Sequence, residues 1–158
     1  VEKSWIKDYG FSLNKMYSDL ASLDAKSVTV ILDACFSGGS RPSEKYKSES
    51  VANQKFVILD PTEMEQPWLN DPDFRVFTSS KGNQTSQGRD LSKSGLFTYY
   101  LAIGLQGDAD ENSDGKVTME ELVDFVTVNV DKESNGAQTP QFREHEGSKR
   151  EFVLEKIR

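Results

Sequence analysis

An uninterrupted run of β-branched and aliphatic residues, Val28-Thr29-Val30-Ile31-Leu32, is the feature that most limits how this chain can fold. Such a run predicts a strand that is buried on both faces, as the strands of parallel sheets are. It ends abruptly at Asp33-Ala34-Cys35, and the small residues Ser37-Gly38-Gly39 then allow a sharp turn. Because open α/β sheets hold their reactive groups just beyond the carboxyl ends of their strands, the residues after Leu32 are the first candidates for chemistry.

Helices are predicted on both sides of this run, and two further strands are predicted after it. Apolar residues at helical spacing indicate helices that begin at Ser12, Ser94 and Thr118. The run at 74–79 predicts a second strand, and residues 151–155 alternate enough to form an edge strand. A helix followed by a buried strand is half of a βαβ unit, so the pattern favours an α/β fold. The 158 residues are enough for one domain with its own core.

The charge and composition of the chain argue against several classes of partner. A net charge of −7 and a pI near 4.8 disfavour binding to nucleic acid or to anionic membranes. No apolar run approaches the roughly 20 residues of a membrane span. The single cysteine excludes an internal disulfide and suits a reducing compartment, so we expect a cytoplasmic protein. The first residue is Val1 and not Met, which predicts that the chain is part of a longer protein.

Cys35 is the first candidate nucleophile, although a lone cysteine is most often a small residue of the core. Its place at the exit of a strand, between an acid and a glycine turn, favours a reactive thiol instead. Asp33 precedes it by two residues, so both side chains lie on the same side of an extended chain. There the carboxylate of Asp33 would either face a pocket and bind a cation or stabilise the turn at the strand end. The residues alone leave these alternatives open.

The stretch Asp33-Ala34-Cys35-Phe36-Ser37-Gly38 resembles the nucleophile motif Asp-x-Cys-x-Ser-Gly of the caspase-like cysteine peptidases, especially the metacaspases and their bacterial relatives. Three more landmarks follow in the order of that family. They are a strand and loop at 76–86, a helix at 94–101, and an acidic turn with Gln138-Thr139-Pro140 after it. The resemblance implies an α/β fold in which a mostly parallel sheet is sandwiched between helices.

The same resemblance implies how the chain is divided and what it does. Residues 1–158 would be the C-terminal portion of one caspase-like domain, with the nucleophile strand first, a linker loop at 40–55 and a small-subunit-like region at 56–158. The implied function is that of a cysteine endopeptidase that cuts protein or peptide substrates after Arg or Lys. No cofactor is needed for that chemistry.

Individual residues take their implied roles from the motifs that they match. Cys35 would attack the scissile carbonyl and form an acyl-enzyme, while its own amide helps to hold the oxyanion. Asp33 matches the acidic residue of the S1 pocket that selects Arg or Lys. Ser79 and Ser80 lie where the family pairs its backbone with an extended substrate, a form of β-augmentation.

The family's general base is absent from the expected place. In relatives it is a histidine in a His-Gly motif upstream of the nucleophile, but none of the 34 residues before Cys35 is histidine. The single histidine, His145, follows the cysteine in a polar stretch that indicates an exposed loop. We therefore expect the base on an upstream segment or partner chain of the same protein. The alternative is a catalytically dead caspase-like module with a regulatory or binding role.

The polar segment after the nucleophile carries basic residues that a peptidase specific for Arg or Lys could cut in its own chain. Its composition is typical of an exposed loop, and an ordinary solvated loop explains it equally well. The candidate autocleavage sites are Arg41, Lys45, Lys47 and Lys55.

An acidic turn between two predicted helices fits the twelve-position loop of an EF-hand, which would make the chain a calcium-binding module. The same residues have a competing interpretation, because Thr118-x-x-Glu121 is also a helix capping box and Asp-Gly is a favoured turn. The predicted Ca²⁺ ligands are Asp110, Asn112, Asp114, the Lys116 carbonyl, Thr118 and Glu121.

Overall fold

The computed structural model describes residues 12–33, 66–81, 84, 88–89, 94–148 and 154–155. The stretches that carry Cys35 and the basic linker sites Arg41, Lys45, Lys47 and Lys55 lie outside the described residues. In the described part no helix is long and apolar enough to cross a bilayer.

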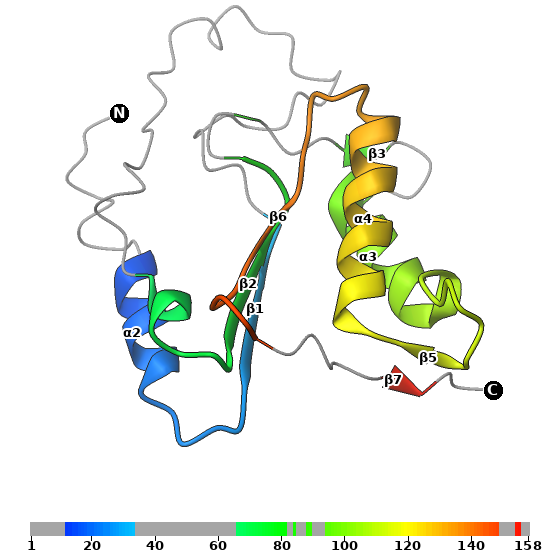
Figure 1. Cartoon of the computed structure of the whole chain (residues 1–158). Helices are drawn as coiled ribbons and strands as arrows, with labels where there is room; N and C mark the ends of the chain where they lie inside the picture. Colours follow the sequence, from blue (N-terminus) through cyan, green and yellow to red (C-terminus); the bar gives the residue numbers. More distant parts are fainter. Residues whose placement is uncertain are drawn as a thin grey trace, which may run out of the picture.

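Three strands form the central sheet, in the order β1 (Val28–Leu32), β2 (Phe74–Thr78) and β6 (Gln141–Arg143). β1 and β2 are parallel, with Leu32 opposite Thr78, and β6 is antiparallel to β2 (Figure 1). Within the described residues the sheet is therefore small and mixed. This fits an α/β fold, but it does not confirm the mostly parallel sheet that the sequence predicted.

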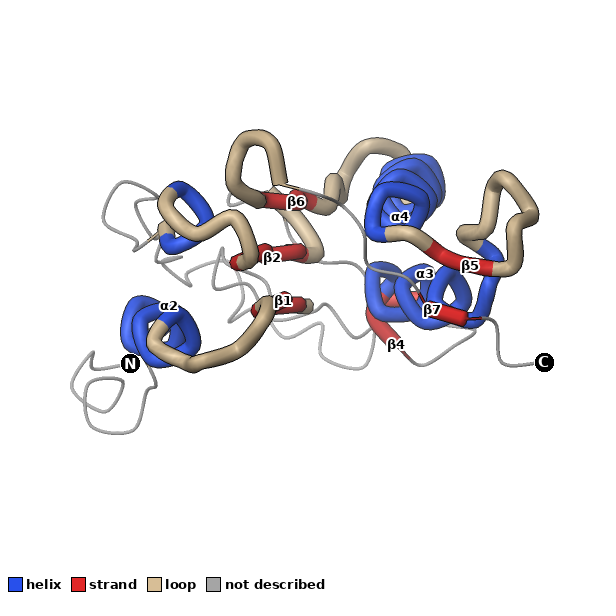
Figure 2. Tube along the Cα trace, turned by 60° about the horizontal axis from the view of Figure 1, so that its bottom comes forward, coloured by secondary structure: helices blue, strands red, loops and turns tan. Residues whose placement is uncertain are grey.

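Helices lie on both faces of this sheet because the side chains of β2 alternate between two cores (Figures 1 and 2). Phe74 and Val76 face a cluster that includes Tyr17 of α2 (Leu13–Ala21) and Trp68 of η4 (Pro67–Leu69). Phe77 faces the other way, into a larger cluster built by α3 (Leu96–Ile103) and α4 (Met119–Glu133). The buried residues of β2 thus join the two helical layers.

The remaining elements are short. A π-helical turn, η5 (Gly104–Asp108), continues α3, and Gly107 inside it has a φ of +118° that ends the regular helical geometry. Two small ribbons complete the described fold. One pairs β3 (Gly88–Arg89) with β4 (Ser94–Gly95), and the other pairs β5 (Lys116–Val117) with β7 (Leu154–Glu155).

Local sequence signals account for the starts of two of the helices. Ser12 is the N-cap of α2, and its hydroxyl accepts a hydrogen bond from the Lys15 amide at 3.3 Å. Thr118 is the N-cap of α4, as the sequence predicted. α3 differs, because Gly95 at its N-cap offers no side-chain hydrogen bond and Ser94 belongs to β4. Its position depends instead on the burial of Leu96 and Phe97.

Candidate active site

The carboxyl ends of β1 and β2 bring Asp33 next to Ser79 and Ser80. Since the two strands are parallel and in register, the residues that follow Leu32 and Thr78 meet at one edge of the sheet, which we call the strand-end edge. The Ser79 amide extends the ladder by donating to the Leu32 carbonyl at 2.9 Å. Ser79 and Ser80 are buried, whereas Asp33 is only partly buried. The structure thus gathers all the predicted substrate-side residues in one place.

The carboxylate of Asp33 is contacted by a residue far away in the sequence. Thr98, in the first turn of α3, donates a short hydrogen bond from Oγ1 to Asp33 Oδ2 across 65 positions of the chain. Phe97 fixes this turn because its buried ring packs edge-on against Phe77 of β2, with the ring centroids 4.9 Å apart. The second helical layer therefore supplies a donor to the acid at the strand-end edge.

The backbone that follows β2 is held by a fully buried amide side chain. Gln138 Nε2 donates to the Ser79 carbonyl at 2.8 Å, and Gln138 is 0% exposed. Its own backbone is fixed by the Ser134 hydroxyl, which accepts from the Gln138 amide and donates to its carbonyl. With its amide bonded to Leu32 and its carbonyl to Gln138, Ser79 is tied to two separate parts of the fold.

Gln84 connects the loop after β2 to the loop that follows α4. Its Oε1 accepts from the Thr139 amide at 2.8 Å and from the Lys81 amide at 3.3 Å. Its Nε2 donates to Thr139 Oγ1 at 3.3 Å and to the Gly136 carbonyl at 3.5 Å. One side chain thus joins segments that lie more than 50 residues apart, and it keeps the turn after Ser80 next to residues 136–139.

His145 lies at the other end of the sheet from this edge. It follows β6, whose antiparallel pairing places Arg143 opposite Val76. Three residues beyond His145, the Ser148 hydroxyl donates to the carbonyl of Pro72, just before β2, at 2.8 Å. The chain around His145 therefore runs toward the amino end of β2, away from Asp33. It is partly buried, which differs from the exposed loop residue that the sequence predicted.

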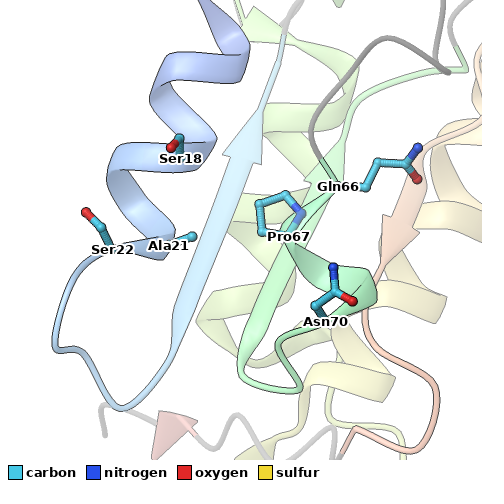
Figure 3. Close-up of a pocket in the computed structure, with 6 residues that line it drawn as sticks. All are labelled: Ser18, Ala21, Ser22, Gln66, Pro67 and Asn70. Carbon is cyan, nitrogen blue, oxygen red and sulfur yellow. The ribbon is translucent and has the colours of Figure 1, made fainter.

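A surface pocket lies between the end of α2 and η4 (Figure 3). It is on the face of the sheet that α2 covers, whereas Asp33 is contacted from the layer of α3. No charged side chain lines this pocket, so it lacks the groups that would bind a charged ligand. Its lining consists of Ser18, Ala21, Ser22, Gln66, Pro67 and Asn70.

The acidic turn before α4 is held by hydrogen bonds within its own sequence. Asp110 accepts from the amides of Asp114 and Gly115, both at 3.1 Å, and Asn112 Oδ1 accepts from the same Asp114 amide at 2.8 Å. Asp114 Oδ1 accepts from the Lys116 amide at 2.9 Å. Gly115, the sixth position of the predicted calcium loop, has a φ of +86° that favours glycine.

The end of this turn confirms the predicted capping box. Thr118 Oγ1 accepts from the Glu121 amide at 3.2 Å, and Glu121 Oε2 accepts from the Thr118 amide at 2.9 Å. Hydrogen bonds from the amide and hydroxyl of Thr118 lower the pKa of the Glu121 carboxyl below its ordinary value of 4.5. Among the described residues, no three His, Cys, Asp or Glu side chains form a group that could hold a metal ion. The calcium ligands stay a prediction.

Three residues at the strand-end edge were not predicted from the sequence. Thr98, Gln138 and Gln84 all belong to stretches that resemble family landmarks, but the resemblance gave none of them a role. Each of them has a hydrogen-bond partner 52 to 65 positions away. One sequence feature could have indicated such a contact, namely the position of Gln138 in a Gln-Thr-Pro turn after a predicted helix.

The sequence of the chain matches a known protein family. A family model described as the caspase domain matches residues 10–151 of the 158 in the chain. The match includes Asp33, Cys35 and both serines of the strand-end edge. No curated protein has a significant match to the chain.

Proposed function

The chain belongs to the caspase-domain family, and from that premise we propose a cysteine endopeptidase that cuts after Arg or Lys. Membership indicates a cysteine peptidase in general. The single observation that supports the finer specificity is the position of Asp33, whose partly buried carboxylate stands at the strand-end edge, two residues before Cys35. A carboxylate in that setting is best satisfied by a cationic side chain.

The chemistry proposed for Cys35 is acyl transfer. The thiolate attacks the carbonyl carbon of the scissile peptide, and a tetrahedral oxyanion forms, which backbone amides stabilise. The amine then leaves with a proton from the general acid, and a thioester remains on Cys35. Water, activated by the same group as general base, hydrolyses the thioester and releases the new carboxylate.

The substrate is proposed to pair with backbone near Ser79 and Ser80. The amide and carbonyl of Ser79 already bond to Leu32 and Gln138, so Ser79 would shape this edge while Ser80 meets the substrate. Both serines are buried, so pairing requires the edge to open. Neither side chain is needed for the chemistry.

The general base is proposed to come from an upstream segment or from a partner chain of the same protein. His145 does not supply it, because the chain around it lies toward the opposite end of β2. The position of β1 is consistent with this proposal. Within the described residues β1 pairs with one strand, β2, so an additional segment could pair with its other edge. A catalytically dead module is the outcome if no base is supplied.

The full-length protein provides the test. We expect it to cleave peptides with Arg or Lys before the scissile bond, and to leave matched peptides with Gln at that position intact. Cys35→Ala should abolish cleavage, and Asp33→Asn should lower kcat/KM by at least tenfold, because the cation loses its charged partner. Equal cleavage by the wild type and Cys35→Ala would overturn the peptidase, and cleavage unaffected by Asp33→Asn would overturn the role of Asp33.

The same pair of proteins tests autoprocessing. If the peptidase cuts its own linker, wild-type protein should yield fragments that end at Arg41, Lys45, Lys47 or Lys55, and Cys35→Ala should keep its intact mass. Identical intact masses of the two proteins would reject autoprocessing and leave the cleavage of other substrates unaffected.

Calcium binding by the acidic turn is a second proposed function. It is supported by the positive φ of Gly115 at the sixth loop position, and by the convergence of Asp110 and Asn112 on one amide. Isothermal titration of Ca²⁺ tests it, with Glu121→Gln as control, because Gln keeps the capping acceptor and removes the charge. A binding heat in the wild type that saturates at one Ca²⁺ per chain, and that is absent in Glu121→Gln, would support calcium binding. No heat in either protein would assign the turn to helix capping alone.

A further inference from the structure

The hydrogen bond between Thr98 and Asp33 contributes little to the stability of the fold. Thr98 is exposed in the first turn of α3, and Asp33 is only partly buried at the end of β1. Because the donor is an exposed hydroxyl that otherwise bonds to water, and the acceptor is not the buried Oδ1 atom of Asp33, the net effect of this bond on folding is modest. The burial of Phe97 and Leu96 already holds α3 in place. The hydrogen bond from Thr98 is therefore better explained by its effect on the orientation of the Asp33 carboxylate.

Three features of the fold determine the geometry of this contact. The parallel pairing of β1 and β2 fixes the backbone of Asp33, because the Leu32 carbonyl accepts from the Ser79 amide at 2.9 Å. The edge-on packing of Phe97 against Phe77 fixes the rotation of α3 about its axis. Thr98 follows Phe97 directly, so its hydroxyl is held at a set position relative to the strand end.

A hydrogen bond to one carboxylate oxygen limits the rotation of the carboxylate plane. This matters differently for the two basic side chains. The guanidinium of Arg is a planar fork that binds both oxygens of a carboxylate when their plane is aligned with it. The ammonium of Lys is a compact charge with rotatable donors, so it tolerates a range of carboxylate orientations.

We propose that Thr98 is a positioning residue. It orients the plane of the Asp33 carboxylate so that both oxygens can form a bidentate pair with an arginine guanidinium. This inference rests on the proposed function, and it adds to the site a residue from α3. Thr98 does not touch the reacting atoms. It acts through Asp33, so its removal should weaken the recognition of arginine more than that of lysine.

The test compares two matched peptides, with Arg or Lys before the scissile bond, on the full-length protein. Thr98→Val removes the hydroxyl and keeps the β-branched shape. We expect kcat/KM for the Arg peptide to fall roughly tenfold, mainly through KM, and for the Lys peptide roughly threefold or less. Thr98→Ser, which restores the donor, should recover the wild-type ratio of Arg to Lys cleavage within about twofold.

A double-mutant cycle separates positioning from a general structural effect. In the Asp33→Asn background, Thr98→Val should cause no further change in the ratio, because the charged partner is gone. If Thr98→Val cleaves both peptides as the wild type does, with the same ratio of Arg to Lys cleavage, the role of Thr98 is overturned and the proposed function stands. An equal loss for both peptides that Thr98→Ser fails to rescue would also overturn it. No Cys35-dependent cleavage of either peptide by the wild type would overturn the proposed function together with this inference.

Discussion

The strand-end edge and the acidic turn are both rich in polar side chains, but they are held together in different ways. In the acidic turn, the hydrogen bonds of Asp110, Asn112 and Asp114 span two to five residues. At the strand-end edge, the bonds of Thr98 and Gln138 span 65 and 59 residues. The acidic turn thus forms from its own sequence, whereas the strand-end edge exists only when several distant segments have packed.

This difference predicts how strongly substitutions in the two regions change the stability of the fold. A local turn can change without moving the rest of the fold, and its contribution is about that of one helix cap. An edge built from distant segments depends on the cores behind it, because α3 and the loop after α4 must both be in place. Substitutions behind the strand-end edge should therefore have larger effects than substitutions in the acidic turn.

The largest effect is expected for Phe97→Ala. Phe97 is 0% exposed and packs against Phe77, so the substitution should lower the free energy of unfolding by about 3–5 kcal/mol through lost burial and a cavity. Chemical denaturation measures this loss. Val128→Ala on α4 is the control, since Val128 is 63% exposed and should change stability by at most about 0.5 kcal/mol. Equal effects of the two would contradict the dependence of the edge on its core.

An intermediate effect is expected for Gln138→Leu. The change keeps the approximate volume but leaves the buried Ser79 carbonyl without the Nε2 donor, which should cost about 1–3 kcal/mol. Gln106→Leu makes the same chemical change at an exposed position of η5 and should be close to neutral. If both variants unfold at the same denaturant concentration, Gln138 does not hold the strand-end edge.

The smallest effect is expected at Glu121, and it depends on pH. Its folded pKa is lowered by hydrogen bonds from Thr118, so its ionised form stabilises the fold above the unfolded value near 4.5. This contribution is lost as the pH falls through the lower folded value. Glu121→Gln should keep most of the stability at pH 7, because Gln still accepts the capping bonds, but lose this acid-dependent component. Thermal unfolding between pH 7 and pH 3 compares the two proteins, and identical pH profiles would exclude the contribution of Glu121.

Much of the fold was predictable from short stretches of sequence. The run at 28–32 forms β1, the run at 74–79 contains β2, and Ser12 and Thr118 cap their helices. Each of these features depends on a short apolar run or on a hydrogen bond that spans three residues, so neighbouring positions in the sequence determine it. The N-cap of α3 is Gly95, one residue after the predicted Ser94, and Gly95 leaves that helix without a side-chain cap.

By itself the sequence determined the local elements, the acid at Asp33, the position of Cys35 and the family to which the chain belongs. Only the tertiary structure decided that Thr98 contacts Asp33, that Gln138 holds the Ser79 carbonyl, and that His145 lies toward the other end of β2. The reason is physical. A strand or a cap is stabilised by neighbours in the chain, whereas a side chain of α3 meets β1 only after two apolar cores have fixed the layers between which the sheet lies.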